Sequence, residues 1–194
     1  MEYGLLGEKL GHSYSKEIHE QLADYTYDLC PVSREDFDAF MTKHDFKAIN
    51  VTIPYKQDVI PYLDAMDDNA ASIGAVNTIV NKNGRLEGHN TDFSGFLYMI
   101  EKHNIRIEGC KCLVLGNGGA AKAVIAVLKH LNAAGIKLVS RRDTPDTITY
   151  EECIAHHTDA EVIVNTTPVG MYPNTDASPL DLTPFTNCHA VLDV

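Results

Sequence analysis

The chain has 194 residues, with 27 acidic and 16 basic side chains and a formal net charge of −11. This charge argues against a nucleic-acid or anionic-membrane partner, because both require clustered Lys and Arg side chains. Hydrophobic residues at 44% and charged residues at 22% are typical of a globular protein, and the length allows one large or two small domains. No signal-peptide pattern and no membrane-length apolar run is present, so we expect a cytoplasmic protein.

Five cysteines are spread along the chain without the CxxC spacing of a metal or redox site. Cys110 and Cys112 are the nearest pair, and they stand at the start of an apolar strand pattern. We interpret all five as reduced thiols and expect no metal site.

The first half of the chain alternates strand and helix patterns. Helical spacing of Ile18, Leu22 and Tyr25 predicts the first helix, and Asn83-Gly84 between two apolar runs predicts a hairpin. A stretch that resembles a capping box, Ser33–Asp36, opens the second helix. The predicted elements are strand 3–7, helix 15–25, strand 27–32, helix 33–43, strand 47–53, a short helix at 57–62, and strands 78–81 and 85–89.

The second half repeats strand and helix, which predicts a parallel, doubly wound sheet. A helix begins at Thr91 and fades at residues 102–104, and there we place the boundary between two domains, 1–104 and 105–194. The following elements are strand 112–115, helix 119–131, strand 136–140, helix 150–156, strand 162–165 and strand 190–194, with a long proline-containing loop at 167–187. The predicted fold class is α/β, with an N-terminal α/β domain and a C-terminal Rossmann-type domain.

A dinucleotide-binding fingerprint, Gly116-Asn-Gly-Gly-Ala-Ala121, joins an apolar strand to an amphipathic helix. Gly116 permits the tight turn, Gly118 lets the backbone approach a pyrophosphate, and Ala121 allows close packing of the helix on the strand. The free N–H groups at the start of the helix favour phosphate binding. The alternative is a glycine-rich connection that binds no ligand.

The residues at the end of the next strand, after Ser140, distinguish NADP from NAD. Arg141 and Arg142 favour NADP, because an Arg at this position can bind its 2′-phosphate. Asp143 could accept from the ribose hydroxyls of NAD, so NAD stays open. The alternative is a solvated charge cluster in a loop.

Four polar clusters stand where apolar segments of the first half end. They are Ser13-x-Ser15, Asn50–Lys56, Gly74–Thr78 and Gly88–Asp92. Short hydroxyl and amide side chains beyond strand ends suit a polyhydroxylated ligand, because they supply both donors and acceptors. Each residue also has a structural alternative: Ser13, Ser15 and Asp92 as helix caps, Thr52 as a strand residue, Asn77 as a turn residue and Lys56 as a surface charge.

Seven stretches in order resemble the shikimate dehydrogenase family, including its quinate/shikimate branch. They are Gly11–Ser15, Asn50–Lys56, Gly74–Thr78, Asn90–Asp92, Gly116–Ala121, Ser140-Arg141 and Asn165–Met171. The resemblance implies reversible reduction of 3-dehydroshikimate to shikimate by NADPH, a step toward aromatic amino acids. It implies a small-molecule substrate and no nucleic-acid or membrane partner, and it leaves the oligomeric state open.

The resemblance also implies a role for each matched position. Ser13 and Ser15 would hold the substrate carboxylate, and Lys56 would be the catalytic acid/base. Thr52, Asn77 and Asp92 would contact ring hydroxyls, with Asp92 also beside Lys56. The implied cofactor residues are Gly116, Gly118, Gly119 and Ala120 at the pyrophosphate, Ser140, Arg141 and Arg142 at the adenosine end, and Asn165, Thr166 and Thr167 toward the nicotinamide.

The sequence departs from the family in three places. Lys16 stands where the family usually has Pro, and Ser140–Asp143 replaces its Asn-Arg-Thr motif. The family continues beyond Val194 with a substrate-binding Gln and a further helix, so we expect a C-terminally truncated second domain, and the activity of this chain stays open. Two alternatives remain: a quinate/shikimate dehydrogenase that uses NAD, and a non-catalytic ligand-sensing relative. A folate dehydrogenase is disfavoured, because it would need a broad apolar site.

Overall fold

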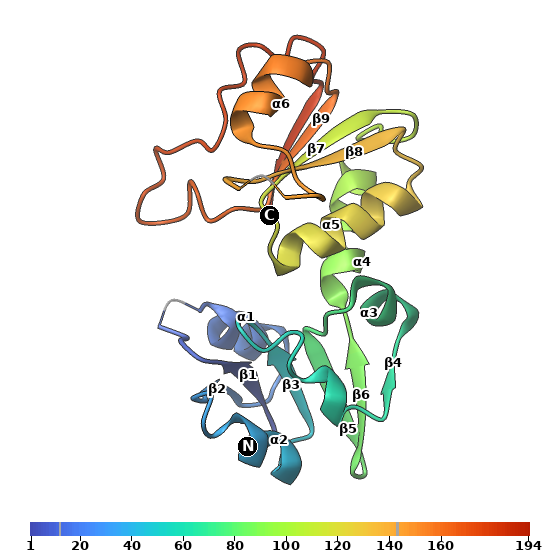
Figure 1. Cartoon of the computed structure of the whole chain (residues 1–194). Helices are drawn as coiled ribbons and strands as arrows, with labels where there is room; N and C mark the ends of the chain where they lie inside the picture. Colours follow the sequence, from blue (N-terminus) through green and yellow to red (C-terminus); the bar gives the residue numbers. More distant parts are fainter. Residues whose placement is uncertain (12, 143) are drawn as a thin grey trace. The chain divides into compact units, whose positions relative to one another are not determined.

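The computed structural model describes residues 1–11, 13–142 and 144–194. These residues divide into two compact units, Met1–Thr91 and Asp92–Val194 (Figure 1). The division lies earlier than the predicted boundary after residue 104. The reason is that helix α4, Thr91–Lys102, buries Phe96 and Ile100 in the core of the second unit.

The first unit is built on a mixed sheet in the strand order β2-β1-β3-β5-β6-β4. Strand β1 pairs in parallel with β2 and β3, whereas β5 pairs antiparallel with β3 and β6. The strands are β1 Tyr3–Gly7, β2 Tyr27–Pro31, β3 Ala48–Val51, β4 Ala65–Met66, β5 Thr78–Lys82 and β6 Arg85–His89. The helices are α1 Ser15–Leu22, α2 Phe37–Lys43, the 3-10 helix η1 Ile60–Tyr62 and α3 Asp68–Ile73.

The main core of this unit lies between the sheet and the helices α2, η1 and α3. Leu6 of β1 packs there with Phe37 and Met41 of α2. The neighbouring residue Leu5 points to the opposite face, as alternation along a strand requires, and packs in a smaller cluster with Tyr27. The two faces of the sheet therefore have cores of unequal size.

The second unit contains a parallel sheet in the order β10-β9-β7-β8. Its elements after α4 are β7 Lys111–Leu115, α5 Gly119–His130, β8 Gly135–Val139, α6 Tyr150–His156, β9 Val162–Asn165 and β10 Ala190–Asp193. Cys112 and Val114 of β7 pack in the cluster that holds α4 and α5, whereas Leu113 and Leu115 pack with Cys153 of α6. Helices thus cover both faces, which confirms the predicted doubly wound α/β fold.

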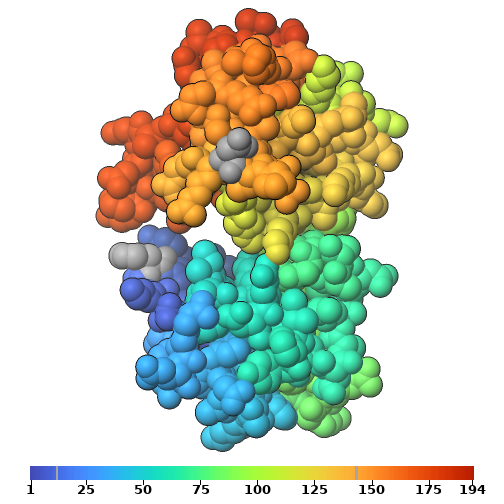
Figure 2. Space-filling model, viewed as in Figure 1, coloured from blue at the N-terminus to red at the C-terminus, as the bar shows by residue number. Residues whose placement is uncertain are grey.

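The predicted loop after β9 is irregular over its whole length and leads away from the sheet before it returns to β10 (Figures 1 and 2). Its middle is exposed, with Tyr172 at 83% of its full accessible surface. Leu180 and Phe185 bring the chain back into the core beside α6. None of the helices in the described part of the chain has the length and apolar character needed to cross a membrane.

The helices of the first unit differ from the prediction. The predicted helix at 57–62 is helical only at Ile60–Tyr62, the first helix ends at Leu22, and the second begins at Phe37 instead of Ser33. Helix α3 was not predicted, although Asp67 caps it by accepting from the Ala70 N–H. The apolar residues that predict α1, Ile18 and Leu22, are 55% and 76% exposed, so this helix does not dock through them.

Candidate active site

Ser13 and Ser15 lie together at the start of α1. The Ser13 hydroxyl donates to the Ser15 hydroxyl at 3.0 Å and accepts from the Ser15 backbone N–H at 3.2 Å. Ser13 is not the N-cap of α1, because Tyr14 holds that position and makes no side-chain cap hydrogen bond. Both serines are partly accessible beside a helix start that favours anions. His12, from the same matched stretch, lies outside the described residues.

Lys56 is carried by a turn that follows β3 and is anchored by Tyr55. The Tyr55 ring is fully buried and stacks on Phe37 at a centroid distance of 4.4 Å, and its hydroxyl donates to the Val32 carbonyl at 2.7 Å. The Lys56 carbonyl accepts from the Val76 N–H at 2.7 Å. The turn is thus fixed both to the core and to the segment that leads into Asn77.

Thr52 begins this turn at the end of β3. Its N–H donates to the Leu6 carbonyl at 2.9 Å, and its methyl group lies where a Cβ on Gly7 would come within 2.7 Å. The glycine at the end of β1 is therefore needed for the close approach of Thr52. The half-buried Thr52 and Lys56 lie in the same short segment.

Asn77 joins that segment to the start of α4. Its Oδ1 accepts from the Thr91 N–H at 2.9 Å, and its Nδ2 donates to the Thr91 hydroxyl at 2.9 Å. Asn77 is 8% exposed, and its own N–H donates to the His89 carbonyl. The side chain therefore holds the first residue of the helix whose second residue is Asp92, a structural role that the turn-residue alternative did not foresee.

A chain of side-chain hydrogen bonds crosses the sheet to reach Asn77. The Tyr27 hydroxyl donates to Asn50 Oδ1 at 2.6 Å, and Asn50 Nδ2 donates to the Thr78 hydroxyl at 3.1 Å. The Thr78 hydroxyl in turn donates to Asn77 Oδ1 at 3.1 Å. Asn50 and Thr78 were named only as parts of matched stretches. Their role depends on pairing between β3 and β5, which no local pattern reveals.

The predicted cofactor residues gather at the carboxyl ends of β7, β8 and β9. Gly116 has a φ of +98°, and a Cβ there would lie 2.9 Å from both Thr166 Oγ1 and Thr167 Cγ2. The Thr166 hydroxyl donates to the Leu115 carbonyl at 2.7 Å. Thr166 and Thr167 therefore support the glycine turn from behind.

The start of α5 has room for a pyrophosphate. A Cβ built on Gly118 or Gly119 would meet nothing within 4 Å, so the space beside the first N–H groups of α5 is open. A polar pocket of about 450 Å³ adjoins this turn and is lined by Asn117, Ser140, Arg141 and Arg142. Such a helix start can take a phosphate group without help from a metal.

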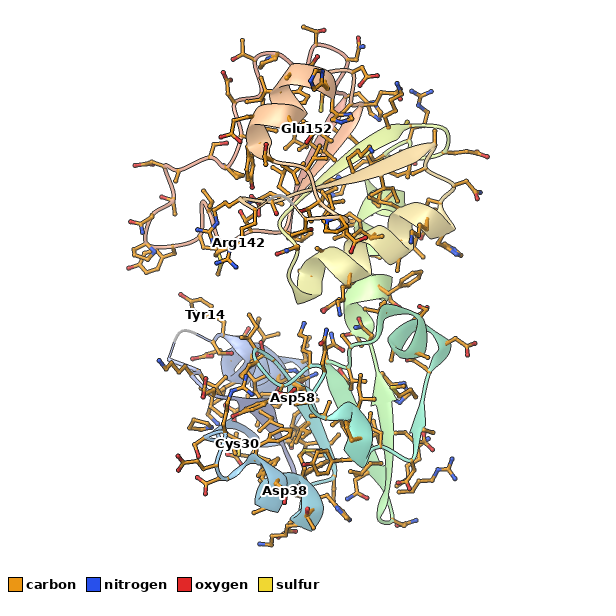
Figure 3. All side chains as sticks on the ribbon, viewed as in Figure 1. Tyr14, Cys30, Asp38, Asp58, Arg142 and Glu152 are labelled. Carbon is orange, nitrogen blue, oxygen red and sulfur yellow. The ribbon has the colours of Figure 1, made fainter. Side chains whose placement is uncertain are left out.

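Within that pocket, Ser140 and the arginines differ in role. The Ser140 hydroxyl accepts from the Arg142 N–H at 3.2 Å and donates to the Arg142 carbonyl, so it shapes the loop after β8. Arg141 and Arg142 are exposed, and Arg142 is labelled at the edge of its loop in Figure 3. Asp143, whose carboxylate leaves NAD as an alternative cofactor, lies outside the described residues.

Asn165 is buried at the end of β9 and organises the loop that follows. Its Oδ1 accepts from the Thr167 hydroxyl at 2.7 Å and from the Thr167 N–H at 3.0 Å, and its Nδ2 donates to the Val169 carbonyl at 3.2 Å. Asn165 thus fixes the position of Thr167 beside the glycine turn.

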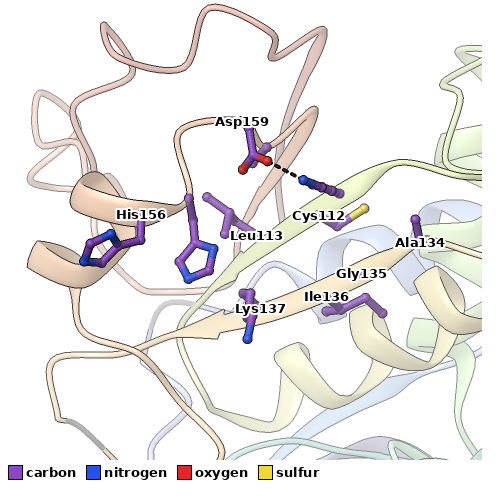
Figure 4. Close-up of a pocket in the computed structure, with 11 residues that line it drawn as sticks. Cys112, Leu113, Ala134, Gly135, Ile136, Lys137, His156 and Asp159 are labelled. Carbon is purple, nitrogen blue, oxygen red and sulfur yellow. Dashed lines mark hydrogen bonds and ion pairs between the residues drawn. The ribbon is translucent and has the colours of Figure 1, made fainter.

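A second hollow of about 470 Å³ lies at the opposite end of the same sheet (Figure 4). It is bordered by Lys111 and Gly135, the first residues of β7 and β8, and by His156 at the end of α6. Lys111 and Asp159 form an ion pair at its rim. Because ligands of open α/β sheets bind beyond the carboxyl ends of the strands, this hollow is not the cofactor site.

The predicted site residues therefore divide by unit into two sets, which we call the first and the second cluster. The first comprises Ser13 and Ser15 at α1, Thr52 and Lys56 after β3, and Asn77 just before β5. The second lies around the glycine turn and comprises Gly116, Gly118, Gly119, Ala120, Ser140, Arg141, Arg142, Asn165, Thr166 and Thr167. Asp92 stands in the first turn of α4.

Comparison with known proteins gives consistent matches. Residues 5–79 match the family model described as shikimate dehydrogenase substrate binding domain. The shikimate dehydrogenase (NADP(+)) of Clostridium beijerinckii is 40% identical over 207 aligned positions, which cover 99% of this chain and 77% of that protein.

Solved structures agree with these sequence matches. A chorismate mutase/shikimate 5-dehydrogenase fusion protein from Clostridium acetobutylicum is similar with a TM-score of 0.88 and 36% identity, covering 98% of this chain and 75% of that one. The shikimate 5-dehydrogenase of Thermus thermophilus, in complex with NADP(H) and shikimate, has a TM-score of 0.84 and 29% identity, covering 100% of this chain and 78% of that one.

Proposed function

The chain belongs to the shikimate dehydrogenase family, and on that premise we propose that it catalyses the reversible reduction of 3-dehydroshikimate to shikimate with NADPH. The family and enzyme class predicted from the sequence are confirmed, and the names of the curated relatives support NADP as the cofactor. The substrate positions and the proton-transfer step are proposals that rest on the contacts described above.

The first cluster binds the substrate in this proposal. Ser13 and Ser15 bind its carboxylate, because their hydroxyls lie together at a helix start whose N–H groups favour an anion. Thr52 and Asn77 of this cluster, together with Asp92 of α4, bind ring hydroxyls, since hydroxyl, amide and carboxylate groups supply the donors and acceptors that a polyol needs.

Lys56 is the proton donor and acceptor in this proposal. NADPH supplies the hydride that turns the ring carbonyl into an alcohol. The oxygen of that carbonyl gains negative charge and needs a proton, and an ammonium supplies both the opposing charge and the proton. The Asp92 carboxylate orients the Lys56 ammonium, and solvent returns a proton to Lys56 after the reduction. In the reverse direction the neutral Lys56 amine accepts the proton of the substrate hydroxyl while the hydride passes to NADP(+).

The observation that carries this assignment is the role of Asn77. Its side chain fixes Thr91, the residue before Asp92, and the preceding residue Val76 donates to the carbonyl of Lys56. The backbones that carry Lys56 and Asp92 are therefore held by adjacent residues of one short segment.

The second cluster binds NADP in this proposal. The backbone of Gly116–Ala120 contacts the pyrophosphate, Arg141 binds the 2′-phosphate, with Ser140 and Arg142 shaping that pocket, and Asn165–Thr167 supports the path toward the nicotinamide. Two exposed guanidinium groups beside the polar pocket favour NADP over NAD.

The test is to incubate the purified chain with shikimate and NADP(+) and to quantify NADPH and 3-dehydroshikimate together. We expect equal amounts of the two products. Binding of shikimate and NADP(+) measured by calorimetry, with no product formed, would instead support the ligand-sensing alternative.

A further inference from the structure

Helix α1 packs against strand β2 through polar side chains, with its apolar side chains exposed. Its apolar side chains Ile18 and Leu22 are 55% and 76% exposed, and none of its residues is buried. Tyr14, just before the helix and labelled in Figure 3, is 75% exposed. Lys16 and Glu20 face strand β2 instead. Apolar burial therefore contributes little to the attachment of α1.

Lys16 and Glu20 together bind both backbone groups of one residue of β2. The Lys16 ammonium donates to Glu20 Oε1 at 2.6 Å and to the Tyr27 carbonyl at 2.8 Å, and Glu20 Oε1 accepts from the Tyr27 N–H at 3.1 Å. Strand β2 is at the edge of the sheet, so among the described residues no further strand pairs with Tyr27 on that side. We call this arrangement the Lys16–Glu20 clamp.

The electrostatics and the surrounding contacts agree with a formed clamp. The hydrogen bond from Lys16, with a smaller contribution from the Tyr27 N–H, lowers the pKa of Glu20 below its usual value. His19 stacks on the Tyr27 ring at a centroid distance of 4.0 Å. Side chains at positions 16, 19 and 20 thus converge on one residue, as i, i+3 and i+4 spacing allows.

The clamp acts at a place that matters for the first cluster. Lys16 follows Ser15 directly, so fixing its side chain to β2 fixes the first turn of α1. Tyr27, the residue that the clamp binds, is also the first donor in the chain of hydrogen bonds through Asn50 and Thr78. One residue therefore links the start of α1 to the polar side chains around Asn77.

We propose that the Lys16–Glu20 clamp is a positioning device that holds Ser13 and Ser15 in place to bind the substrate carboxylate. This inference rests on the proposed function of these serines. Without the clamp the first turn of α1 would fray, and the serines would have to be ordered again during binding, which weakens binding but leaves the chemical step unchanged.

The test measures shikimate oxidation for Lys16→Met and Glu20→Met, because a Gln at position 20 would keep an oxygen that accepts from both Lys16 and the Tyr27 N–H. We expect each variant to raise the KM for shikimate by roughly threefold to tenfold, with kcat and the KM for NADP(+) within about twofold of the parent chain. Lys16→Arg still offers N–H donors to Glu20 and to the Tyr27 carbonyl, so its KM should rise less than that of Lys16→Met. The matched control is Glu17→Met, which removes one negative charge from an exposed position of the same helix turn.

Glu20→Met separates positioning from direct attraction. If the Lys16 ammonium simply attracted the substrate carboxylate, removing the Glu20 charge would strengthen that attraction and would lower the KM. A raised KM in Glu20→Met supports the clamp, whereas a lowered or unchanged KM overturns it. A fall in apparent kcat with the KM values for both ligands unchanged would indicate a smaller folded fraction and would also overturn it.

A second set of variants tests the serines. Ser13→Ala with Ser15→Ala should raise the KM for shikimate by itself, and adding Lys16→Met to that double variant should cost little more. A normal KM in the double variant refutes the proposed role of the serines. A raised KM there, with a normal KM in Lys16→Met alone, refutes only the clamp.

Discussion

At the scale of single residues, the polar side chains of the site differ in how far they are committed to the fold. Asn77, Ser140 and Asn165 are buried and bonded to neighbouring backbone groups, so they shape the loops that carry other residues. Lys56, by contrast, is only half buried and carries its charge at the end of a long side chain. The two kinds of residue should respond differently to substitution.

Lys56→Ala tests the catalytic assignment. Loss of a positioned general acid typically costs about 10²-fold to 10⁴-fold in rate, so we expect kcat to fall by that factor. The KM for shikimate should change much less, because the hydroxyl and carboxylate contacts remain. Steady-state kinetics in both directions measures this. A large rise in KM with kcat preserved would make Lys56 a binding residue and contradict the assignment.

The cysteines make a separate prediction at this scale. Burial raises the pKa of Cys112 to about 12 and that of Cys153 to about 11. A raised pKa lowers the thiolate fraction, so at pH 8 only about one Cys112 in 10,000 would be ionised. We expect both thiols to resist iodoacetamide in the folded chain and to react in urea, as counted by mass spectrometry. Rapid labelling of either in the folded chain would contradict the described core.

At the scale of elements, the turn between β7 and α5 is the most demanding connection in the second unit. Gly116→Ala places a methyl group 2.9 Å from Thr166 and Thr167 at a φ of +98°. Backbone strain alone costs about 1–3 kcal/mol, so we expect lower stability in urea and loss of NADP(+) binding by calorimetry.

The control for this substitution is Gly109→Ala. Gly109 also has a positive φ, of 72°, but a Cβ there meets nothing within 4 Å. It should lose some stability and keep NADP(+) binding. If Gly109→Ala and Gly116→Ala behaved alike, the support of the glycine turn by the two threonines would have no special importance.

The elements also show how far the sequence predicts the fold. The hairpin at Asn83-Gly84 and the strand–turn–helix at Gly116 depend on local turn chemistry, and both were predicted. Helix α3 was missed because it is short, although Asp67 and Gly74 flank it as caps. The spacing of apolar residues could not predict which face of α1 packs on the sheet, because Lys16 and Glu20 bond to a strand that follows in sequence.

The site shows the same limit. The matched stretches predict candidate site residues, and these residues lie in two sets, one in each unit. What those stretches could not reveal is that Asn77 is bonded to Thr91, or that Asn50 and Thr78 lead to it from Tyr27. These contacts join residues far apart in sequence and depend on the pairing of β3 with β5.

At the scale of the whole molecule, a net charge of −11 coexists with a proposed site for a highly anionic cofactor. The two facts are compatible, because charges separated by more than about 10 Å are largely screened at ordinary ionic strength. Binding then depends on local groups, the N–H groups at the start of α5 and the two arginines beside it.

The central claim is that this chain reduces 3-dehydroshikimate with NADPH, and a matrix of two substrates and two cofactors tests it most directly. Initial rates are measured for 3-dehydroshikimate and 3-dehydroquinate, each with NADPH and with NADH. The account predicts the highest kcat/KM for 3-dehydroshikimate with NADPH, and a marked rise in the KM for NADPH in Arg141→Ala. Faster turnover of 3-dehydroquinate with NADH would contradict it.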